Sequence, residues 1–166
     1  MVRNLAFAVF ATAALAQAAA AATITFVVQL DGQQEVNGSG TPGQGDLDGS
    51  GTATLMIDDV ANTISWNIVV SNIVLPLSAA HIHGAPAGTN GSPVVDFSGQ
   101  LTGSGLLDTD LAAVLANPSN FYVNLHNSGY PAGALRGQLG TPVVEPVTLA
   151  LLALAGGSLA LRRRSA

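Results

Sequence analysis

The dominant pattern in this sequence is an alternation of apolar and polar residues with a period of two, which is typical of strands that bury one face. In the first such stretch, Phe26, Val28 and Leu30 alternate with Val27 and Gln29. The same pattern recurs over residues 53–57, 64–71, 121–126 and 134–139. Clusters of Gly, Ser, Asn, Asp and Pro separate the stretches and supply turn geometry.

Several short strands with one apolar face each, within residues 23–141, predict an all-β domain. We expect an antiparallel, Greek-key-like β-sandwich, because no long crossover helix is available for a parallel sheet. One short helix is predicted, with Asp108 or Thr109 as its cap, an apolar face made by Leu111, Val114 and Leu115, and an end at Asn117–Pro118. Residues 37–50, rich in Gly, Asp and Ser, are expected to form a mobile loop.

Composition excludes several function classes. The chain has no cysteine, so disulfides, thiolate metal sites and cysteine nucleophiles are absent. It also has no lysine, and residues 23–144 contain nine carboxylates against Arg136 alone, which excludes a basic surface for nucleic acid. Since 48% of the residues are apolar and only 9% are charged, disorder driven by charge is excluded too.

Residues 1–22 have the order of parts of a secretory signal peptide. Arg3 gives the positive end, residues 5–15 are apolar, and Ala20–Ala22 fits a cleavage site, although Ala16–Ala18 fits one as well. The apolar run is short and rich in alanine, which favours a cleaved signal over a membrane anchor. We therefore expect the protein to be exported.

Residues 142–166 form a second targeting segment. An uncharged apolar run, expected to be a helix over residues 147–161, is followed by Arg162–Arg164, which the positive-inside rule keeps in the cytoplasm. The run is shorter than a comfortable span and predicts transient anchoring. With Val144-Glu145-Pro146 before it, the segment resembles a PEP-CTERM sorting signal, which implies a partner of the exosortase type in a Gram-negative bacterium. Val144 stands where that family has the first proline of Pro-Glu-Pro.

The three histidines, His81, His83 and His126, are the candidate site residues. His81 and His83 lie two apart, so in a strand they share one face while Ile82 points to the core. If Val123 and Leu125 are also in the core, His126 joins Asn124 on the opposite face. Residues 121–126 and 134–139 are expected to pair as a hairpin, which brings Arg136 and Gln138 to the same polar face.

Two interpretations of this face stay open. Three neutral imidazoles could hold copper or zinc and leave one coordination position free. Alternatively, the histidines hydrogen-bond to turns and backbone and bind nothing. His-x-His on a β-sandwich resembles part of the copper–zinc superoxide dismutase site, but that enzyme needs more histidines and a bridging ligand. No Gly-x-Ser-x-Gly turn is present, and the paired aspartates are explained by turns and caps, so we expect no enzyme activity.

Segments in one order along the chain resemble the CHRD domain, which is named from chordin and also occurs in exported bacterial proteins. The matching segments are Leu30–Val36, Gly49–Ala53, Ala80–Pro86, Pro93–Val95, Tyr122–His126 and Pro131–Leu139. They span residues 23–139, and the pair His-Ile-His-Gly and Asn-x-His…Arg-Gly-Gln-Leu is the most specific part.

The resemblance implies a binding module, since in chordin these domains belong to an extracellular antagonist of growth-factor signalling. The family commonly has an acidic residue where Ala134 stands, so Glu35 is the expected partner of Arg136, in an ion pair that joins the first and last strands. We therefore expect a non-catalytic module of the cell envelope or extracellular matrix, with an extracellular polysaccharide or envelope protein as its partner. A copper- or zinc-binding protein is the alternative.

Overall fold

The computed structural model describes residues 22–143, which form eight strands, one α-helix and one short 3₁₀-helix. The elements are β1 (Thr23–Asp31), β2 (Ser50–Asp58), β3 (Thr63–Ser71), β4 (Ala79–Gly84), β5 (Pro93–Asp96), β6 (Thr102–Leu107), α1 (Leu111–Ala116), η1 (Pro118–Asn120), β7 (Phe121–His126) and β8 (Leu135–Gln138).

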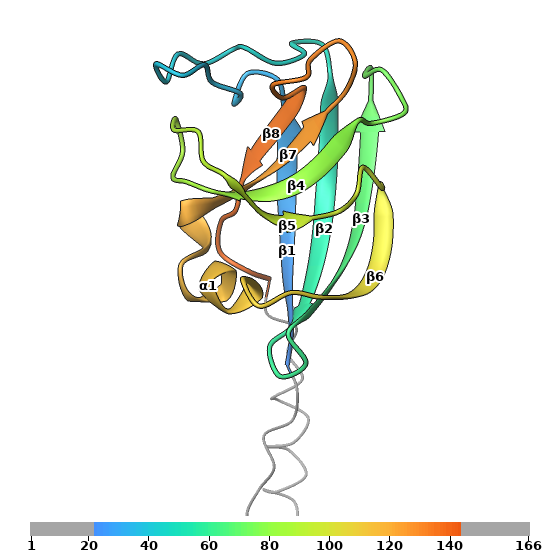
Figure 1. Ribbon diagram of the computed structural model, residues 1–166, viewed down its shortest axis with the longest axis vertical. Helices are drawn as coiled ribbons and strands as arrows, with labels where there is room; N and C mark the ends of the chain where they lie inside the picture. The colour runs from blue at the N-terminus through green and yellow to red at the C-terminus, as the bar shows by residue number, and fades with distance from the viewer. Residues whose placement is uncertain (1–21, 144–166) are drawn as a thin grey trace, which may run out of the picture.

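All eight strands belong to one antiparallel sheet, in the order β5-β4-β7-β8-β1-β2-β3-β6. The sheet curls, so that β4, β5, β7 and β8 cross in front of β1, β2 and β3 (Figure 1). Strands β8 and β1 join the two halves through a single pair, Asp31 with Arg136. The expected all-β antiparallel architecture is therefore confirmed, with its two layers formed by one continuous sheet.

The core lies between the two halves of the sheet and follows the predicted alternation. Strands β1, β2 and β3 pair over their full lengths, and the register sets Phe26 opposite Leu55 and Leu55 opposite Trp66. From the other half, Ile82, Val123 and other apolar residues of β4 and β7 complete the same buried cluster. Burial of alternate residues on every long strand is what makes the register unique, because a slip by one residue would turn the apolar set to solvent.

The remaining differences from the sequence-based expectation are local. Strands β5 and β6, which form the two edges of the sheet, were not predicted from alternation. The α-helix and its end at Asn117 are confirmed, but its cap is Asp110 and not Asp108 or Thr109. The Asp108 carboxylate instead accepts the Asp110 backbone N–H at 2.9 Å, which fixes the turn that precedes the helix.

The two ends of the described part of the chain lie together. The Val143 N–H donates to the Thr25 carbonyl at 2.7 Å, and both ends lie at the bottom of Figure 1. The predicted signal peptide (1–22) and sorting segment (142–166) lie outside the described residues, apart from Ala22, Pro142 and Val143. Within residues 22–143, no helix is long and apolar enough to cross a membrane.

Candidate metal centre

The three predicted site residues come together on the outer face of the β4–β7 pair. Ile82 is fully buried in the core, so its neighbours His81 and His83 lie on the opposite face of β4. On β7, Val123 and Leu125 are buried in the core, which turns His126 to the same face as His81 and His83. The ring centroid of His81 lies 5.3 Å from the centroid of His83 and 5.3 Å from that of His126, and the centroids of His83 and His126 are 5.7 Å apart.

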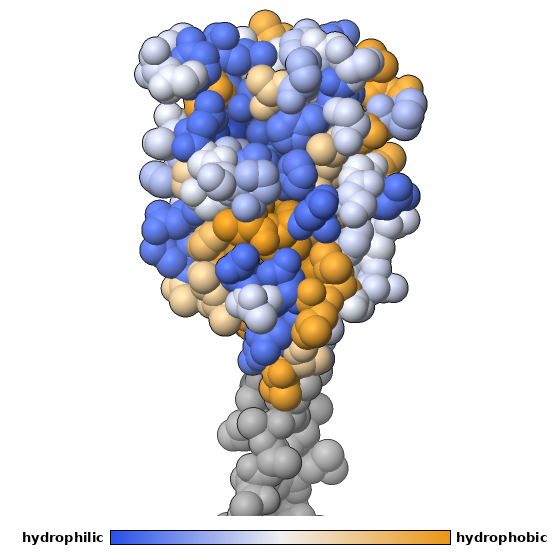
Figure 2. Space-filling model, viewed as in Figure 1, coloured by the Kyte–Doolittle hydropathy of each residue, from blue (hydrophilic) through white to orange (hydrophobic). Residues whose placement is uncertain are grey.

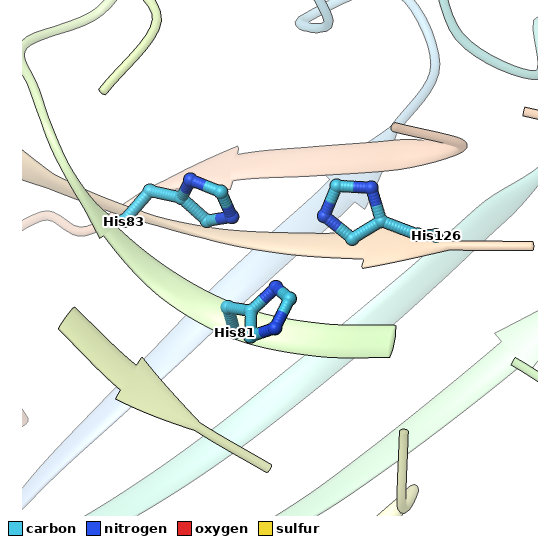
Figure 3. A group of neighbouring side chains, drawn as sticks. All are labelled: His81, His83 and His126. Carbon is cyan, nitrogen blue, oxygen red and sulfur yellow. The ribbon is translucent and has the colours of Figure 1, made fainter. Parts of the chain in front are cut away.

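One nitrogen of each ring faces the other two rings without a hydrogen-bond partner. The buried, unpartnered atoms are Nδ1 of His81, Nε2 of His83 and Nε2 of His126. One ligating nitrogen from each histidine lies within 4.8 Å of the others. Figure 3 shows the three rings grouped around a common space beside β4 and β7.

The second nitrogen of each ring is directed at an oxygen atom. His83 Nδ1 lies 2.9 Å from the Gly91 carbonyl, and His126 Nδ1 lies 3.1 Å from the Pro131 carbonyl. Because a carbonyl only accepts, both histidines carry the proton on Nδ1, which leaves Nε2 with a free lone pair. His81 is turned the other way, with Nε2 3.7 Å from Asp96 Oδ1 and Nδ1 facing the two other histidines.

Burial keeps the two inner histidines in the form that binds metal. His83 is 7% exposed and His126 is 9% exposed. Desolvation is the main cause that lowers the pKa of both rings below the usual 6.5, and hydrogen bonds to Gly91 and Pro131 oppose it in part. These two imidazoles are therefore neutral, as a metal ligand must be.

The arrangement fits the ligand requirements of copper or zinc. Nitrogens bound to one such ion at about 2.0–2.1 Å lie roughly 3.4 Å apart, so the rings need to approach by at most about 1.4 Å. His83 and His126 each have the second contact that metal-bound histidines commonly make, a hydrogen bond to a backbone carbonyl, and His81 has Asp96 at 3.7 Å. These two hydrogen bonds therefore orient Nε2 of His83 and of His126 toward the His81 ring.

Arg136 and Tyr122 lie behind His83 and form a stack with it. The Tyr122 ring is stacked on the His83 ring, with centroids 5.0 Å apart, and the Arg136 guanidinium lies 3.5 Å from the centre of the Tyr122 ring. Arg136 and Tyr122 are each 1% exposed. The sequence placed Arg136 on this face correctly, but the stacking role of Tyr122 was not foreseen.

The predicted ion pair between Glu35 and Arg136 is wrong. Among residues 22–143, the one contact within ion-pair distance is that of His81 with Asp96. Arg136 donates instead to uncharged oxygens, those of the Pro86 and Thr89 carbonyls and of the Asn90 and Gln138 side chains. The loop after β4 turns its carbonyl groups toward Arg136, so uncharged acceptors satisfy the guanidinium. The alternation of apolar and polar residues does not reveal how a loop directs its carbonyls.

Glu35 is buried, and its carboxylate lies next to Gly133 together with the side-chain oxygen of Asn124. Its Oε1 accepts the Val36 N–H at 3.3 Å, whereas Glu35 Oε2 and Asn124 Oδ1 have no hydrogen-bond partner. Both of these atoms lie so close to Gly133 that a Cβ there would collide with them. Burial is the largest effect on the Glu35 carboxyl and raises its pKa, although the Val36 N–H, the charge of Arg136 and hydrogen bonding to the Asn124 side chain oppose the shift.

Loops cover this face and supply the groups that sequence reasoning missed. Gly91 lies in the β4–β5 loop and Pro131 in the β7–β8 loop, and each contacts a histidine through its backbone carbonyl. The histidines were expected to project outward; they lie on the predicted face but are largely covered. In Figure 2 the hydrophilic residues gather over the upper part of the molecule, where these loops lie in Figure 1.

A curled antiparallel sheet with one buried polar site under its loops defines a class of small all-β modules in which a rigid scaffold presents a site and loops enclose it. The chain belongs to the CHRD domain family, whose family model matches residues 26–139. CHRD domains are binding modules. No curated protein and no solved structure matches the chain.

Proposed function

We propose that this protein is a non-catalytic metal-binding module that holds one copper or zinc ion with His81, His83 and His126. The observation that carries the proposal is the convergence of three buried ring nitrogens that have no other partner. The ligand atoms are Nδ1 of His81 and Nε2 of His83 and His126. Imidazole is a good ligand for both metals, so the donor set does not favour one over the other.

The interpretation without a metal explains Nδ1 of His83 and His126 but leaves one nitrogen of each of the three rings without a partner. Hydrogen bonds to Gly91 and Pro131 satisfy Nδ1 of His83 and His126, as that interpretation expects. It leaves Nδ1 of His81 and Nε2 of His83 and His126 buried without a partner, and each unsatisfied polar group costs about 1–3 kcal/mol. An ion between the rings would remove this cost.

Three protein ligands would leave a coordination position for water or for a group of another molecule. The chain supplies the orientation of the rings and a mostly covered site, and His81, whose side chain is 18% exposed, lies nearest to solvent. The bound metal would supply a Lewis-acidic or, for copper, a redox-active centre. Because the described residues place no acid–base pair or nucleophile of known pattern beside the histidines, we propose binding and not catalysis.

We also propose that the protein is exported to the cell envelope or extracellular matrix. Residues 1–22 and 142–166 support this as a signal peptide and a sorting segment, the latter for a protease of the exosortase type with transient membrane anchoring. An extracellular polysaccharide or envelope protein remains the proposed macromolecular partner. Residues 22–143 contain one arginine, Arg136, and no lysine, and Arg136 is buried. An anionic polysaccharide would therefore find no exposed lysine or arginine on this part of the chain and is the least suitable of the proposed partners.

Elemental analysis of the exported chain tests the metal site. The protein is purified from the periplasm without a chelator or an affinity tag of histidines, and copper and zinc are measured per chain. We expect close to one ion, which is lost when His81, His83 and His126 are all changed to alanine. Circular dichroism of the variant controls for folding. A folded wild-type chain that takes up neither metal, even when both are offered, would contradict the proposal.

A further inference from the structure

The β4–β5 loop, here defined as residues 85–92, carries the Gly91 carbonyl that accepts the His83 Nδ1–H. Pro86, Thr89 and Asn90 in this loop are exposed, and its sequence has no apolar anchor beyond Ala85. A loop of this composition needs other contacts to hold one carbonyl in place. The structure supplies them from β7 and β8.

Arg136 on β8 binds the loop at three points. Its guanidinium donates to the Thr89 carbonyl at 2.9 Å, to the Pro86 carbonyl at 3.2 Å and to Asn90 Oδ1 at 3.3 Å. Asn90 in turn donates through Nδ2 to the Val36 carbonyl at 2.9 Å. These contacts join residues 46 to 54 positions apart in the sequence, so they fix the loop to the body of the domain.

Tyr122 on β7 lies between Arg136 and His83 and binds the same loop. Its hydroxyl accepts the Gly91 N–H at 3.2 Å, while its ring is stacked on His83 at an interplanar angle of 19°. Gly91 is therefore held at its N–H by Tyr122, and its carbonyl holds His83. The Arg136 guanidinium on the other side of the Tyr122 ring completes the stack.

We propose that Arg136 and Tyr122 are positioning residues of the metal centre, which hold the β4–β5 loop so that Gly91 fixes the His83 ring with Nε2 directed at the metal. This inference rests on the proposed function. It gives a buried arginine without an ion pair a specific role, because replacing its guanidinium removes the contacts that order the loop. Neither residue touches the metal.

His126 serves as an internal control for His83, because a different loop orients it. His126 is oriented by Pro131, in a loop that Asn127 holds through hydrogen bonds from the Gly129 and Tyr130 N–H groups to its Oδ1. Among these hydrogen bonds none involves Arg136 or Tyr122. Loss of the β4–β5 loop contacts should therefore change the tautomer of His83 and leave that of His126 unchanged.

Two mild substitutions test this in the full-length exported protein. Tyr122→Phe keeps the stack and removes the hydroxyl that holds Gly91, and Asn90→Ala removes one contact of Arg136 together with the bond to Val36. Asn67→Ala, on the exposed face of β3, is the matched control because Asn67 makes no side-chain hydrogen bond within residues 22–143. Arg136→Gln is a third, more severe variant, used if it folds.

The first measurement is the tautomer of each histidine in the metal-free protein, by ¹⁵N–¹H NMR at a pH above the titration of the rings. We expect His83 in the wild type and in Asn67→Ala to carry its proton on Nδ1, and in Tyr122→Phe and Asn90→Ala to become a mixture of tautomers. His126 should keep Nδ1–H throughout. An unchanged His83 in folded variants, or an equal change in His126, would overturn the proposal.

The second measurement is zinc affinity, by competition with a chromophoric chelator, repeated with copper(II). We expect affinity to fall about 10- to 100-fold in Tyr122→Phe and Asn90→Ala, as is usual when the second contact of a metal-bound histidine is lost. Unchanged affinity in folded variants contradicts the positioning role. A wild-type chain that binds neither metal overturns the proposed function instead, and the tautomer measurement still decides how the loop acts on His83.

Discussion

Glu35 is a buried carboxyl whose charged form its surroundings disfavour. Glu35 is 3% exposed, and its unpartnered oxygen, Oε2, lies beside Gly133, as does Asn124 Oδ1. Burial is the largest effect on the Glu35 carboxyl and raises its pKa, although hydrogen bonding to the Val36 N–H and to the Asn124 side chain opposes the shift. The charge of Arg136 reduces this effect without reversing it.

Glu35→Gln should therefore stabilise the domain at neutral pH. The amide carries no charge to desolvate, and its NH₂ group can donate to Asn124 Oδ1, so we expect a gain of about 1 kcal/mol in the free energy of unfolding. Because the folded-state pKa of Glu35 is raised, the charged form opposes folding above that pKa and the penalty disappears as pH falls. Denaturant unfolding should show the gain at neutral pH and little difference in acid. A less stable variant at neutral pH would contradict this account.

The sequence predicts the face on which a side chain lies but not its hydrogen-bond partners. Alternation was enough to place His81, His83 and His126 on one face, because the direction of a strand side chain depends only on its position in the strand. It could not give the tautomers, which depend on the Gly91 and Pro131 carbonyls in loops. Nor could it give the partners of Arg136, which come from residues 86–90 and from Gln138.

At the scale of elements, the strands with a buried face were predictable and the edge strands were not. Strands β1, β2, β3, β7 and β8 show the alternation that burial on one side imposes. Strand β6 has the sequence Thr-Gly-Ser-Gly-Leu-Leu, and β5 is only Pro93–Asp96. Edge strands are exposed on one side and short, so they do not need the apolar pattern on which the prediction depends.

Gly103 explains how β6 fits against the sheet. It pairs with Trp66 of β3, and a Cβ at this position would overlap the Trp66 indole ring. Trp66 is in turn stacked on Phe97, with ring centroids 4.5 Å apart, and donates to the Gln100 carbonyl at 2.9 Å. The glycine therefore lets the edge strand approach over the face of the indole.

Gly103→Ala should displace β6 or the indole and cost about 1–3 kcal/mol, the usual range for overpacking. Trp66 is the only tryptophan of the chain, so its fluorescence reports directly on this contact. Gly38→Ala is the control, since a Cβ at Gly38 would meet no atom within 4 Å. Equal stability and equal fluorescence of the two variants would show that β6 adapts without cost.

At the scale of the whole molecule, the described part of the chain carries mostly negative charge. Residues 22–143 contain nine carboxylates, of which only Glu35 and Asp46 are buried, while Arg136 is fully covered. The surface field of this part of the chain is therefore negative, which attracts cations and repels anionic polymers. A metal ion would approach the histidines along a favourable gradient.

Salt should for this reason slow the uptake of metal more than it promotes release. The Debye length falls from about 30 Å at 0.01 M salt to about 8 Å at 0.15 M, which screens the distant carboxylates. We expect stopped-flow measurements to give an association rate for zinc that falls across this range while the dissociation rate changes little. An association rate that is independent of salt would show that the surface charge has no part in binding.

The pH dependence of stability should also depend on the histidine site. The folded-state pKa values of His83 and His126 lie below 6.5, so the unfolded chain binds more protons as pH falls past that value. The free energy of unfolding of the metal-free protein should therefore decrease from pH 6.5 downward, through the pKa values of the folded state.

Comparison with the variant that lacks all three histidines isolates this effect from Glu35, whose raised pKa acts in the opposite direction. The difference in free energy of unfolding between wild type and variant, followed by chemical denaturation, should shrink or change sign on acidification. A difference that stays constant with pH would contradict burial of neutral rings.

The meeting of Thr25 and Val143 has a mechanical consequence. The two ends of residues 22–143 lie together, so tension between them would act on hydrogen bonds one after another. It would begin with the Val143–Thr25 bond and continue to β8, whose only register pair with β1 is Asp31 with Arg136. Such peeling needs little force, and single-molecule stretching should show a low first rupture. Because β8 carries Arg136, we expect a pull on the ends to loosen the histidine cluster before the apolar core opens. An ion bound at the proposed site would then be released while the chain is still half folded.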